Sequence, residues 1–473
     1  MDEERQKIGQ PAVPLPPRGL GLLLAIGPGL VWCGEYIGSG EVILATRNGA
    51  IFGVAILWVP VLAIFAKYWI GLAGAHYTVT TGEGMIDMMS RMPGPRNWVI
   101  WPVFVGQVCS AAVSTAALAN LTGIFSAYFI PLPPMVLAWI AVSAIIGITW
   151  SGAFDPLKRV MSLLVALIIL GACIVAVETW PGFRAIADGL FRFHVPSVPD
   201  WTVGQGIAAE SSWSELLPLL GWAAGGFASQ VWYTYWVMGA GYGMTRGRGY
   251  GVPLDPDRLY AINASEAEDI RAWRRLVTVD ATVALTIGIV VTSAFMIAGS
   301  GVLGPLHLAP EGETVAMELS RLFGEKWGRI GAHLFVLAGL AAMISTMLGQ
   351  FAGWPRLLAD CARVLFPAVS RYPWKSQFRT ILILFAISNI VIVYSFGWKP
   401  VGLVQVGAIL DGLILTPLQA IAVAVTLFFV MPKFFKPEVR PLVKANKILA
   451  VGLALAFVLY GYFCVVQVPK LFQ

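Results

Sequence analysis

The sequence predicts an all-α integral membrane protein with about eleven transmembrane helices. Of its 473 residues, 58% are hydrophobic and 12% are charged, about half the charged fraction of a typical soluble domain. The mean hydropathy is +0.75, and apolar runs of roughly 20 residues, enough to span the hydrocarbon core, recur along the whole chain. Glycine (50) and proline (30) are frequent, as expected where membrane helices pack closely or break.

The expected spans follow one another along the whole chain. They are residues 20–48, 51–77, 98–127, 134–152, 157–179, 215–241, 276–303, 328–353, 378–397, 400–431 and 445–468. With the N-terminus on the inner side, alternate loops place 23 lysines and arginines inside and 8 outside, and Lys67 lies within the second span. Because cytoplasmic loops carry the excess of basic residues, this asymmetry supports both the number of spans and their orientation.

The same assignment predicts where the protein resides. We expect a multi-pass protein of the cell membrane, with a polar, Pro-rich cytoplasmic tail at residues 1–19, a single transmembrane domain over 20–473 and the C-terminus outside. Basic loops that face anionic lipid then explain the formal charge of +6, so no nucleic-acid partner is expected. The five cysteines show no metal-ligand spacing, and no cofactor is indicated.

Two spans carry glycine clusters that favour a broken helix. The clusters are Gly34–Glu41 in the first span and Gly221–Gln230 in the sixth, and each glycine inside a helix costs about 1 kcal/mol relative to alanine. Breaks at matching positions of two inverted repeats hold the solute in many secondary transporters. We therefore expect repeats at about 20–179 and 215–431, an additional helix at 445–468, and transport by alternating access. The alternative is that these glycines only allow close helix packing.

Around these clusters the chain resembles the Nramp family of divalent-metal transporters, which have the LeuT fold. The resemblance rests on Gly27-Pro28-Gly29, Tyr36-Ile37 and Gly49–Gly53 around the first span, Thr81-Gly82-Glu83 after the second, Gly349–Gly353 in the eighth and Gln405 in the tenth. It implies two inverted repeats of five helices with helices 1 and 6 broken, and a glutamine at position 405 that faces the site. Proteins of this fold often work as monomers.

The motifs that carry the family's chemistry are different in this chain. The first-span Asp-Pro-Gly-Asn aligns with Gly38-Ser39-Gly40-Glu41, and the sixth-span Met-Pro-His aligns with Ala228-Ser229-Gln230. Ser114 and Ala117 stand where the family has the acids of its proton route. Without a thioether, the site loses its preference for softer transition metals. A divalent ion also needs carboxylate charge to offset its dehydration, and Glu41 alone supplies it at the first break.

Charged residues inside the spans are further candidates, because a charge in hydrocarbon must be paired or hydrated. Glu41 borders the first break and is expected to line the solute path, or alternatively to form a structural pair with Arg47. Glu35 and Asp411 are candidate proton or ion carriers, or else packing residues held by hydrogen bonds. Structural roles are expected for the other intramembrane charges, Asp280 and Lys67.

The predicted substrate site joins the two breaks. Its residues are Gly38, Ser39, Gly40, Glu41, Gly225, Ala228, Ser229, Gln230 and Gln405, with Glu41 as the one candidate metal ligand. We expect a transporter of a small polar or cationic solute that is not a transition metal. Aromatic residues near the second break are candidates to line a site for an organic solute, including a cation, and the alternative is that they face lipid or pack between helices. The alternative is a carrier of hydrated Mg²⁺ or Mn²⁺. No nucleophile–base pair or nucleotide loop indicates an enzyme.

Overall fold

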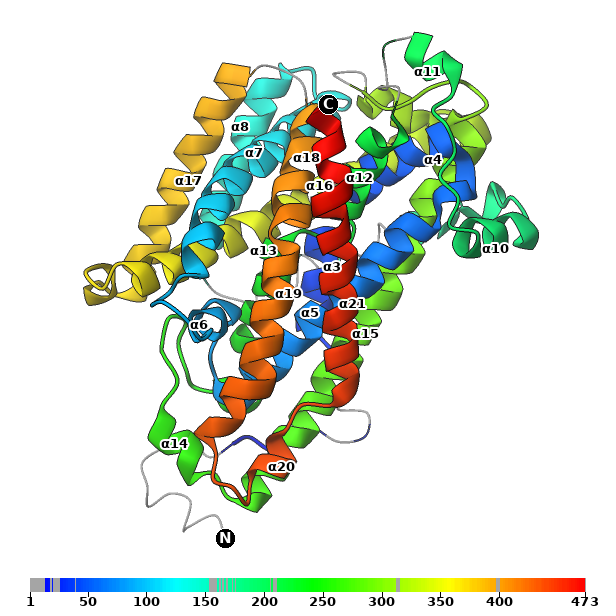
Figure 1. Ribbon diagram of the computed structural model, residues 1–473. Coiled ribbons are helices and arrows are strands. Elements are labelled where there is room, and N and C mark those ends of the chain that lie inside the picture. Colours follow the sequence, from blue (N-terminus) through cyan, green and yellow to red (C-terminus); the bar gives the residue numbers. More distant parts are fainter. Residues whose placement is uncertain are drawn as a thin grey trace.

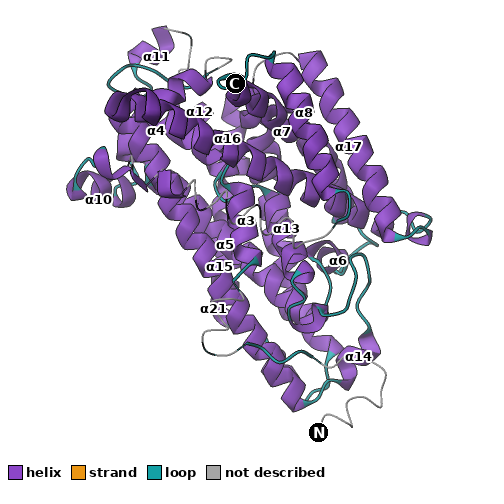
Figure 2. Cartoon of the chain, turned by 180° about the vertical axis from the view of Figure 1, so that it is seen from behind, coloured by secondary structure: helices purple, strands orange, loops and turns teal. Residues whose placement is uncertain are grey.

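The computed structural model describes residues 13–17, 19, 26–38, 40–152, 160, 163, 166, 169–171, 173–174, 176–204, 206, 211–311, 315–396 and 400–472. Within these ranges every regular element is a helix, as the composition predicts. The helices form an elongated bundle (Figure 1). The short helices α14 (Pro256–Ala261) and α20 (Arg440–Val443) lie at one end, and α11 (Asp200–Gly204) lies at the other (Figures 1 and 2).

Six of the described helical segments are long and apolar enough to cross a membrane. They are α5 (Trp58–Thr81), α7 (Ile100–Ala127), α15 with its extension (Ala264–Leu303), the main part of α16 (Gly328–Leu365), the run from α18 to η9 (Val401–Phe434), and α21 with its extension (Lys447–Lys470). The helices α8 (Pro134–Thr149) and α17 (Trp374–Phe396) pack against α7 and α16. The fifth expected span, 157–179, lies largely outside the described residues, so the number of eleven stays a prediction.

The first and sixth spans are broken, which confirms that prediction. The first runs as α3 (Pro28–Tyr36) and resumes as a π-helical turn η1 (Gly40–Ala45) and α4 (Thr46–Phe52). The sixth runs as α12 (Ser212–Trp222) and α13 (Phe227–Gly239). Ala224 and Gly225, between them, have φ values of 60° and 68°, in the left-handed region that ends a right-handed helix.

Two helix boundaries differ from the expected ones for local reasons. The helix of the second expected span, α5, begins at Trp58 instead of residue 51. Gly53, with φ 67°, ends α4, and a short 3₁₀ turn follows before α5 starts. The helix α15 begins at Ala264 instead of residue 276. Asn263 and Glu266 form a reciprocal capping box there, which satisfies two free backbone groups and lets the helix start within a polar stretch.

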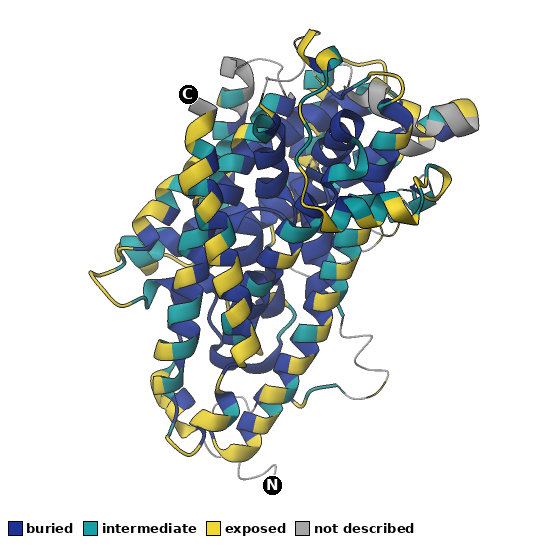
Figure 3. Cartoon of the chain, turned by 45° about the vertical axis from the view of Figure 1, so that its right-hand side comes forward, coloured by how far each residue is buried: buried dark blue, intermediate teal, exposed yellow. Residues whose placement is uncertain are grey.

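The centre of the bundle is dense in buried aromatic side chains. Trp32 of α3 stacks on Tyr233 of α13 with ring centroids 4.4 Å apart, and Trp232 of α13 meets Trp354 of α16 edge to face at 5.1 Å. Figure 3 shows buried residues on the inner faces of the helices and exposed residues along the outer faces. The halves of the broken spans are buried among the other helices.

The two ends of the described chain lie at opposite ends of the bundle. Trp273 Nε1 donates to the carbonyl of Pro14 at 2.7 Å, which holds the N-terminal segment near α20, whereas the C-terminal end of α21 lies at the other end (Figure 1). An odd number of spans requires this arrangement. Which end faces the cytoplasm, and the repeat boundaries at 20–179 and 215–431, stay predictions.

Candidate functional site: a pocket between the broken helices

A small pocket lies where the two breaks meet. Its volume is about 10 Å³, which is room for about one water molecule. The lining residues are Glu35, Tyr36, Trp222, Gly225, Gly226, Ser229, Trp232, Thr346, Gln350, Trp354 and Asp411. The pocket is therefore built from α3, the sixth-span break, α16 and the π-helical turn η7 (Leu410–Ile414) of the tenth span.

Glu35 reaches the pocket from the last turn of α3. Its Oε2 accepts a hydrogen bond of 2.7 Å from Ser229 Oγ, which in turn accepts one of 3.0 Å from Trp32 Nε1. A Cβ at Gly349 of α16 would overlap Cγ of Glu35. Glycine at position 349 thus leaves the space that the carboxylate needs, and Ser229 on α13 fixes its direction.

Asp411 contacts the sixth-span break from the opposite side. Its Oδ1 accepts from Gln107 Nε2 at 2.7 Å and from the amide of Ala228 at 3.3 Å. The amides of the first turn of a helix have no partner within that helix and carry partial positive charge, so a carboxylate is favoured there. A Cβ at Gly226 would overlap Oδ2 of Asp411, which explains why the break ends in a glycine.

Glu41 lies behind the pocket and is not among its lining residues. Its Oε2 accepts from the amide of Gly38 at 3.1 Å, and its Oε1 is buried without a hydrogen-bond partner. Arg47, the alternative partner proposed for Glu41, forms a two-point pair with Glu215 of α12, at 2.8 Å and 2.9 Å. Glu41 therefore caps the first-span break, and the expected pair with Arg47 is replaced by one that joins α4 to α12.

Lys67 of α5 reaches the sixth-span break from a third side. Its Nζ donates to the carbonyls of Gly221, Ala223 at 3.0 Å and Gly225 at 2.5 Å. The side chain is fully buried, and the ring of Tyr460 lies 5.4 Å from the nitrogen. We expected only a structural role for this lysine. Its position in the middle of an apolar span indicated that the amine needs a partner, but the sequence could not indicate which carbonyls it contacts.

The remaining predicted site residues divide between the pocket and its surroundings. Gly225 and Ser229 line the pocket, and Gln230 Nε2 donates to the carbonyl of Ala224 at 2.9 Å inside the break. A Cβ at Gly38 would overlap Thr346 Oγ1, and one at Gly40 would overlap Cδ1 of Trp222, so both glycines allow close approach of neighbouring elements. Ser39 lies outside the described residues.

Gln405 is not part of the pocket. Its Nε2 lies 3.4 Å from Oε2 of Glu215, so it belongs with the Arg47–Glu215 pair, half-buried on α18 (Pro400–Ile409). Conversely, Thr346, Gln350 and Trp354 of α16 line the pocket without having been predicted. The small and polar residues of α16 indicated that one face of this helix points into the bundle, but they did not indicate that this face lines a pocket together with α3 and the sixth-span break.

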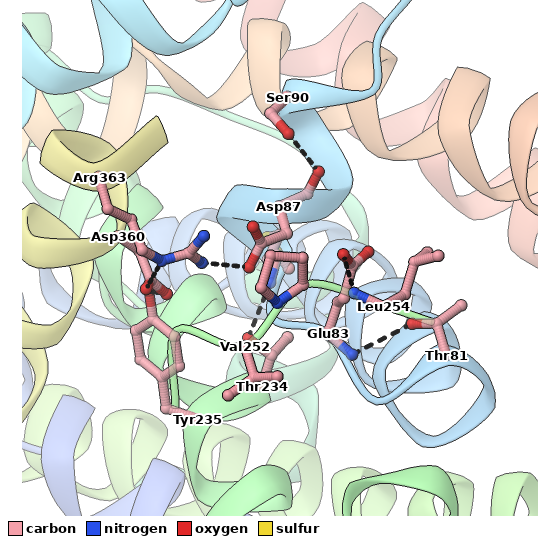
Figure 4. A network of polar contacts seen from close by, with 12 residues as sticks. Thr81, Glu83, Asp87, Ser90, Thr234, Tyr235, Val252, Leu254, Asp360 and Arg363 are labelled. Atoms are coloured by element: carbon pink, nitrogen blue, oxygen red, sulfur yellow. Dashed lines mark hydrogen bonds and ion pairs between the residues drawn. The ribbon is translucent and has the colours of Figure 1, made fainter. Parts of the chain in front are cut away.

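The pocket lies between two sets of ion pairs. On one side, Arg47–Glu215 joins the halves of the broken spans. On the other side, Arg363 of α16 pairs with Asp87 of α6 (Met85–Ser90) at 2.5 Å and with Asp360 at 2.9 Å. Tyr235 of α13 donates to Asp360 at 2.8 Å (Figure 4). Each set thus ties together elements that are distant in the sequence.

The model of the Nramp family, described as natural resistance-associated macrophage protein-like, matches residues 29–465. The chain belongs to the Nramp family. The crystal structure of the Eremococcus coleocola manganese transporter superposes with a TM-score of 0.65 and 14% identity, over 97% of this chain and 90% of that chain. This likeness confirms the predicted LeuT-type fold.

Curated relatives match a shorter stretch of this Nramp-family chain. The uncharacterised protein PM0681 of Pasteurella multocida is 26% identical over 157 residues, which are 32% of this chain and 36% of that protein. The divalent metal cation transporter MntH of Yersinia enterocolitica is 25% identical over 187 residues, 38% of this chain and 43% of that protein. The aligned part thus spans less than half the length of these relatives.

The pocket offers oxygen donors and aromatic faces. Its polar groups include the carboxyl groups of Glu35 and Asp411, the hydroxyls of Ser229 and Thr346, and the amide of Gln350. Neither sulfur nor imidazole lines it. Over the part of the chain that the structure describes, no three His, Cys, Asp or Glu side chains lie close enough to hold a metal ion. Such a donor set suits a hard cation that keeps part of its water.

Proposed function

We propose that this Nramp-family protein is a secondary transporter of a small hard cation, with Mg²⁺ as the first candidate. The observation that carries the proposal is the pair of carboxylates, Glu35 and Asp411, that face one pocket of about 10 Å³. Two carboxyl groups at an atom-sized space offer oxygen ligands to a cation. Mg²⁺ is typically bound through one or two carboxylates and retained waters, which would enter as the pocket widens.

The donor types support a preference for hard ions. Softer transition metals favour sulfur and imidazole ligands, whereas Mg²⁺ favours carboxylate, carbonyl and water oxygen. Relatives such as MntH are named divalent metal cation transporters, which supports a divalent substrate. In this proposal Glu35 and Asp411 hold the ion, and Glu41, the ligand expected from the sequence, stabilises the break behind it.

A small organic cation is the second candidate. Tyr36, Trp222, Trp232 and Trp354 line the pocket, and aromatic faces attract organic ammonium groups through cation–π contacts. Such a solute is much larger than one water molecule, so this function requires the aromatic side chains to move apart when the solute enters. We therefore place it behind the metal cation.

Uptake into liposomes tests both candidates. Native protein, Glu35→Gln, Asp411→Asn and the exposed control Glu438→Gln are reconstituted and loaded with a Mg²⁺ or Mn²⁺ indicator. We expect saturable Mg²⁺ uptake by native protein and by Glu438→Gln, and a loss of more than about tenfold in the two pocket variants, equivalent to about 1.4 kcal/mol.

Two other outcomes of the uptake experiment would change the proposed substrate. Selective uptake of Mn²⁺ over Mg²⁺ would contradict the preference for hard ions. Uptake of neither metal, together with uptake of a labelled organic ammonium compound that Asp411→Asn abolishes, would establish the second candidate.

A further inference from the structure

Three backbone carbonyls converge on one side-chain nitrogen at the sixth-span break. The carbonyls of Gly221, Ala223 and Gly225 all accept from Lys67 Nζ. An ammonium group has three N–H donors and no acceptor, so the number of acceptors matches the number of donors. No side chain from α12 takes part in this set of contacts.

The backbone conformation of the break produces this convergence. The helix α12 ends at Trp222, Ala223 turns to ψ 126°, and Ala224 and Gly225 have φ values of 60° and 68°. The left-handed conformation is unfavourable for alanine by roughly 1–2 kcal/mol. Across this break the carbonyls of Gly221, Ala223 and Gly225 all come within hydrogen-bonding distance of one nitrogen.

Acidic and aromatic side chains lie around this point. The carboxylates of Asp411 and Glu41 both interact electrostatically with Lys67, and the face of the Tyr460 ring lies 5.4 Å from its nitrogen. The carbonyls of Gly221 and Ala223 also lie at the C-terminal end of α12, and such an end carries partial negative charge. Unwound helices in transporters and selectivity filters in channels use such carbonyl groups to coordinate monovalent ions.

We propose that the carbonyls of Gly221, Ala223 and Gly225 form a monovalent-cation site whose resident cation is the ammonium group of Lys67. The chain thereby supplies, on a tether from α5, the ion that a carbonyl site of this kind would otherwise take from solution. The inference goes beyond the proposed transport function, because it holds whichever solute occupies the neighbouring pocket.

A purely structural lysine makes a different prediction from a tethered ion. If Lys67 only filled space and capped a helix, its removal would destabilise the protein equally in every salt. If the carbonyls form a cation site, removal of the side chain leaves a site that a small free cation can enter. Ion-specific recovery of stability therefore separates the two, and it does so without a transport measurement.

The test compares purified full-length native protein with Lys67→Ala, Lys67→Met and Arg356→Met. Arg356 is a second buried cation, which donates to the carbonyl of Gly152 and lies near aromatic rings of α13 and α17, so it controls for loss of any buried charge. The midpoint of thermal unfolding is measured in chloride salts of choline, methylammonium, ammonium, potassium and sodium at constant ionic strength.

We expect Lys67→Ala in choline to unfold roughly 5 °C or more below native protein, because three buried carbonyls lose their donor. At least one small cation, methylammonium first, recovers half or more of this loss with a saturable dependence. Lys67→Met, whose side chain fills the space, and Arg356→Met stay low in every salt, and native protein responds to none of the ions selectively.

Equal responses of Lys67→Ala and Arg356→Met to the five salts would overturn the proposal. So would a Lys67→Ala protein as stable as the native one in choline. If Lys67→Ala cannot be purified in any of these cations, no cation has replaced the ammonium group and the proposal is also overturned.

Discussion

The two broken helices satisfy their free backbone groups with opposite charges. At the first break, the carboxylate of Glu41 accepts from the amide of Gly38. At the sixth break, the ammonium of Lys67 donates to the carbonyls of Gly221, Ala223 and Gly225. Helix N-termini present N–H groups and helix C-termini present carbonyls, so the polarity of the exposed helix end decides which charge is bound.

The comparison extends to the other half of each break. The C-terminal end of α3 is met by neutral hydroxyls, since Ser345 Oγ donates to the carbonyl of Gly34 at 2.9 Å and Thr346 Oγ1 to that of Ile37 at 3.3 Å. The sixth break instead has a charged side chain at both ends: Lys67 contacts the end of α12, and Asp411 contacts the start of α13. We infer that the sixth break depends on charge more strongly than the first.

The largest effect is expected from Lys67→Met. The change shortens the side chain by one atom, leaves three buried carbonyls without a donor, and removes the amine that lies near Asp411 and Glu41. Breaking a buried charged contact on one side typically costs about 3–5 kcal/mol, and we expect a loss of stability in that range from denaturant unfolding. A loss below 1 kcal/mol would show that the sixth break does not rely on this charge.

A slightly smaller loss is expected from Glu215→Gln, which removes the partner of Arg47 between α4 and α12. Arg47 is 2% exposed, so its guanidinium stays buried with a weaker partner, and we expect about 3 kcal/mol of destabilisation. Asp87→Asn is the matched comparison in the other set of ion pairs, where Arg363 retains Asp360, and there we expect about 1 kcal/mol. The reverse order in unfolding measurements would contradict this account.

Gly226→Ala tests whether the position of Asp411 at the start of α13 is needed for transport. The added methyl group would overlap Oδ2 of Asp411 and displace the carboxylate from the pocket. We expect uptake to fall by about tenfold, or about 1.4 kcal/mol, in liposomes. The control is Gly402→Ala on α18, where the new methyl group meets nothing within 4 Å and uptake should stay at the native level.

The smallest effect is expected from Thr346→Val, which removes a neutral donor from the first break. The hydrogen bond to the carbonyl of Ile37 is long, at 3.3 Å, so we expect a loss of about 1 kcal/mol or less. A loss as large as that of Lys67→Met would abolish the distinction between the two breaks.

Much of the architecture could be predicted because it depends on composition along the chain. Apolar runs predicted the membrane class, and the glycine clusters in spans one and six predicted the breaks that α3–η1 and α12–α13 show. Glu35, Asp411 and Ser229 were recognised because polar groups inside apolar spans are conspicuous, and all three line the pocket. The number of spans and the orientation of the chain in the membrane stay predictions.

Other residues could not be assigned because their roles depend on partners far away in the sequence. Gln405 was expected in the site but lies beside Glu215, 190 positions away, and Arg47 pairs with that same glutamate instead of Glu41. Thr346, Gln350 and Trp354 enter the pocket only because α16 presents one face to α3. Residue spacing within one helix contains no information about such contacts.

The sequence by itself determined that this is a membrane-embedded helical protein of the Nramp type, and it predicted breaks in the first and sixth helices. Hydrophobicity and glycine content are local properties, and they act on each segment regardless of its neighbours. Only the tertiary structure decided that Lys67, Asp411 and Glu41 neutralise the helix ends at the breaks. Their charges are stable within the bilayer only where another part of the chain supplies the matching backbone groups, and packing alone brings those groups together.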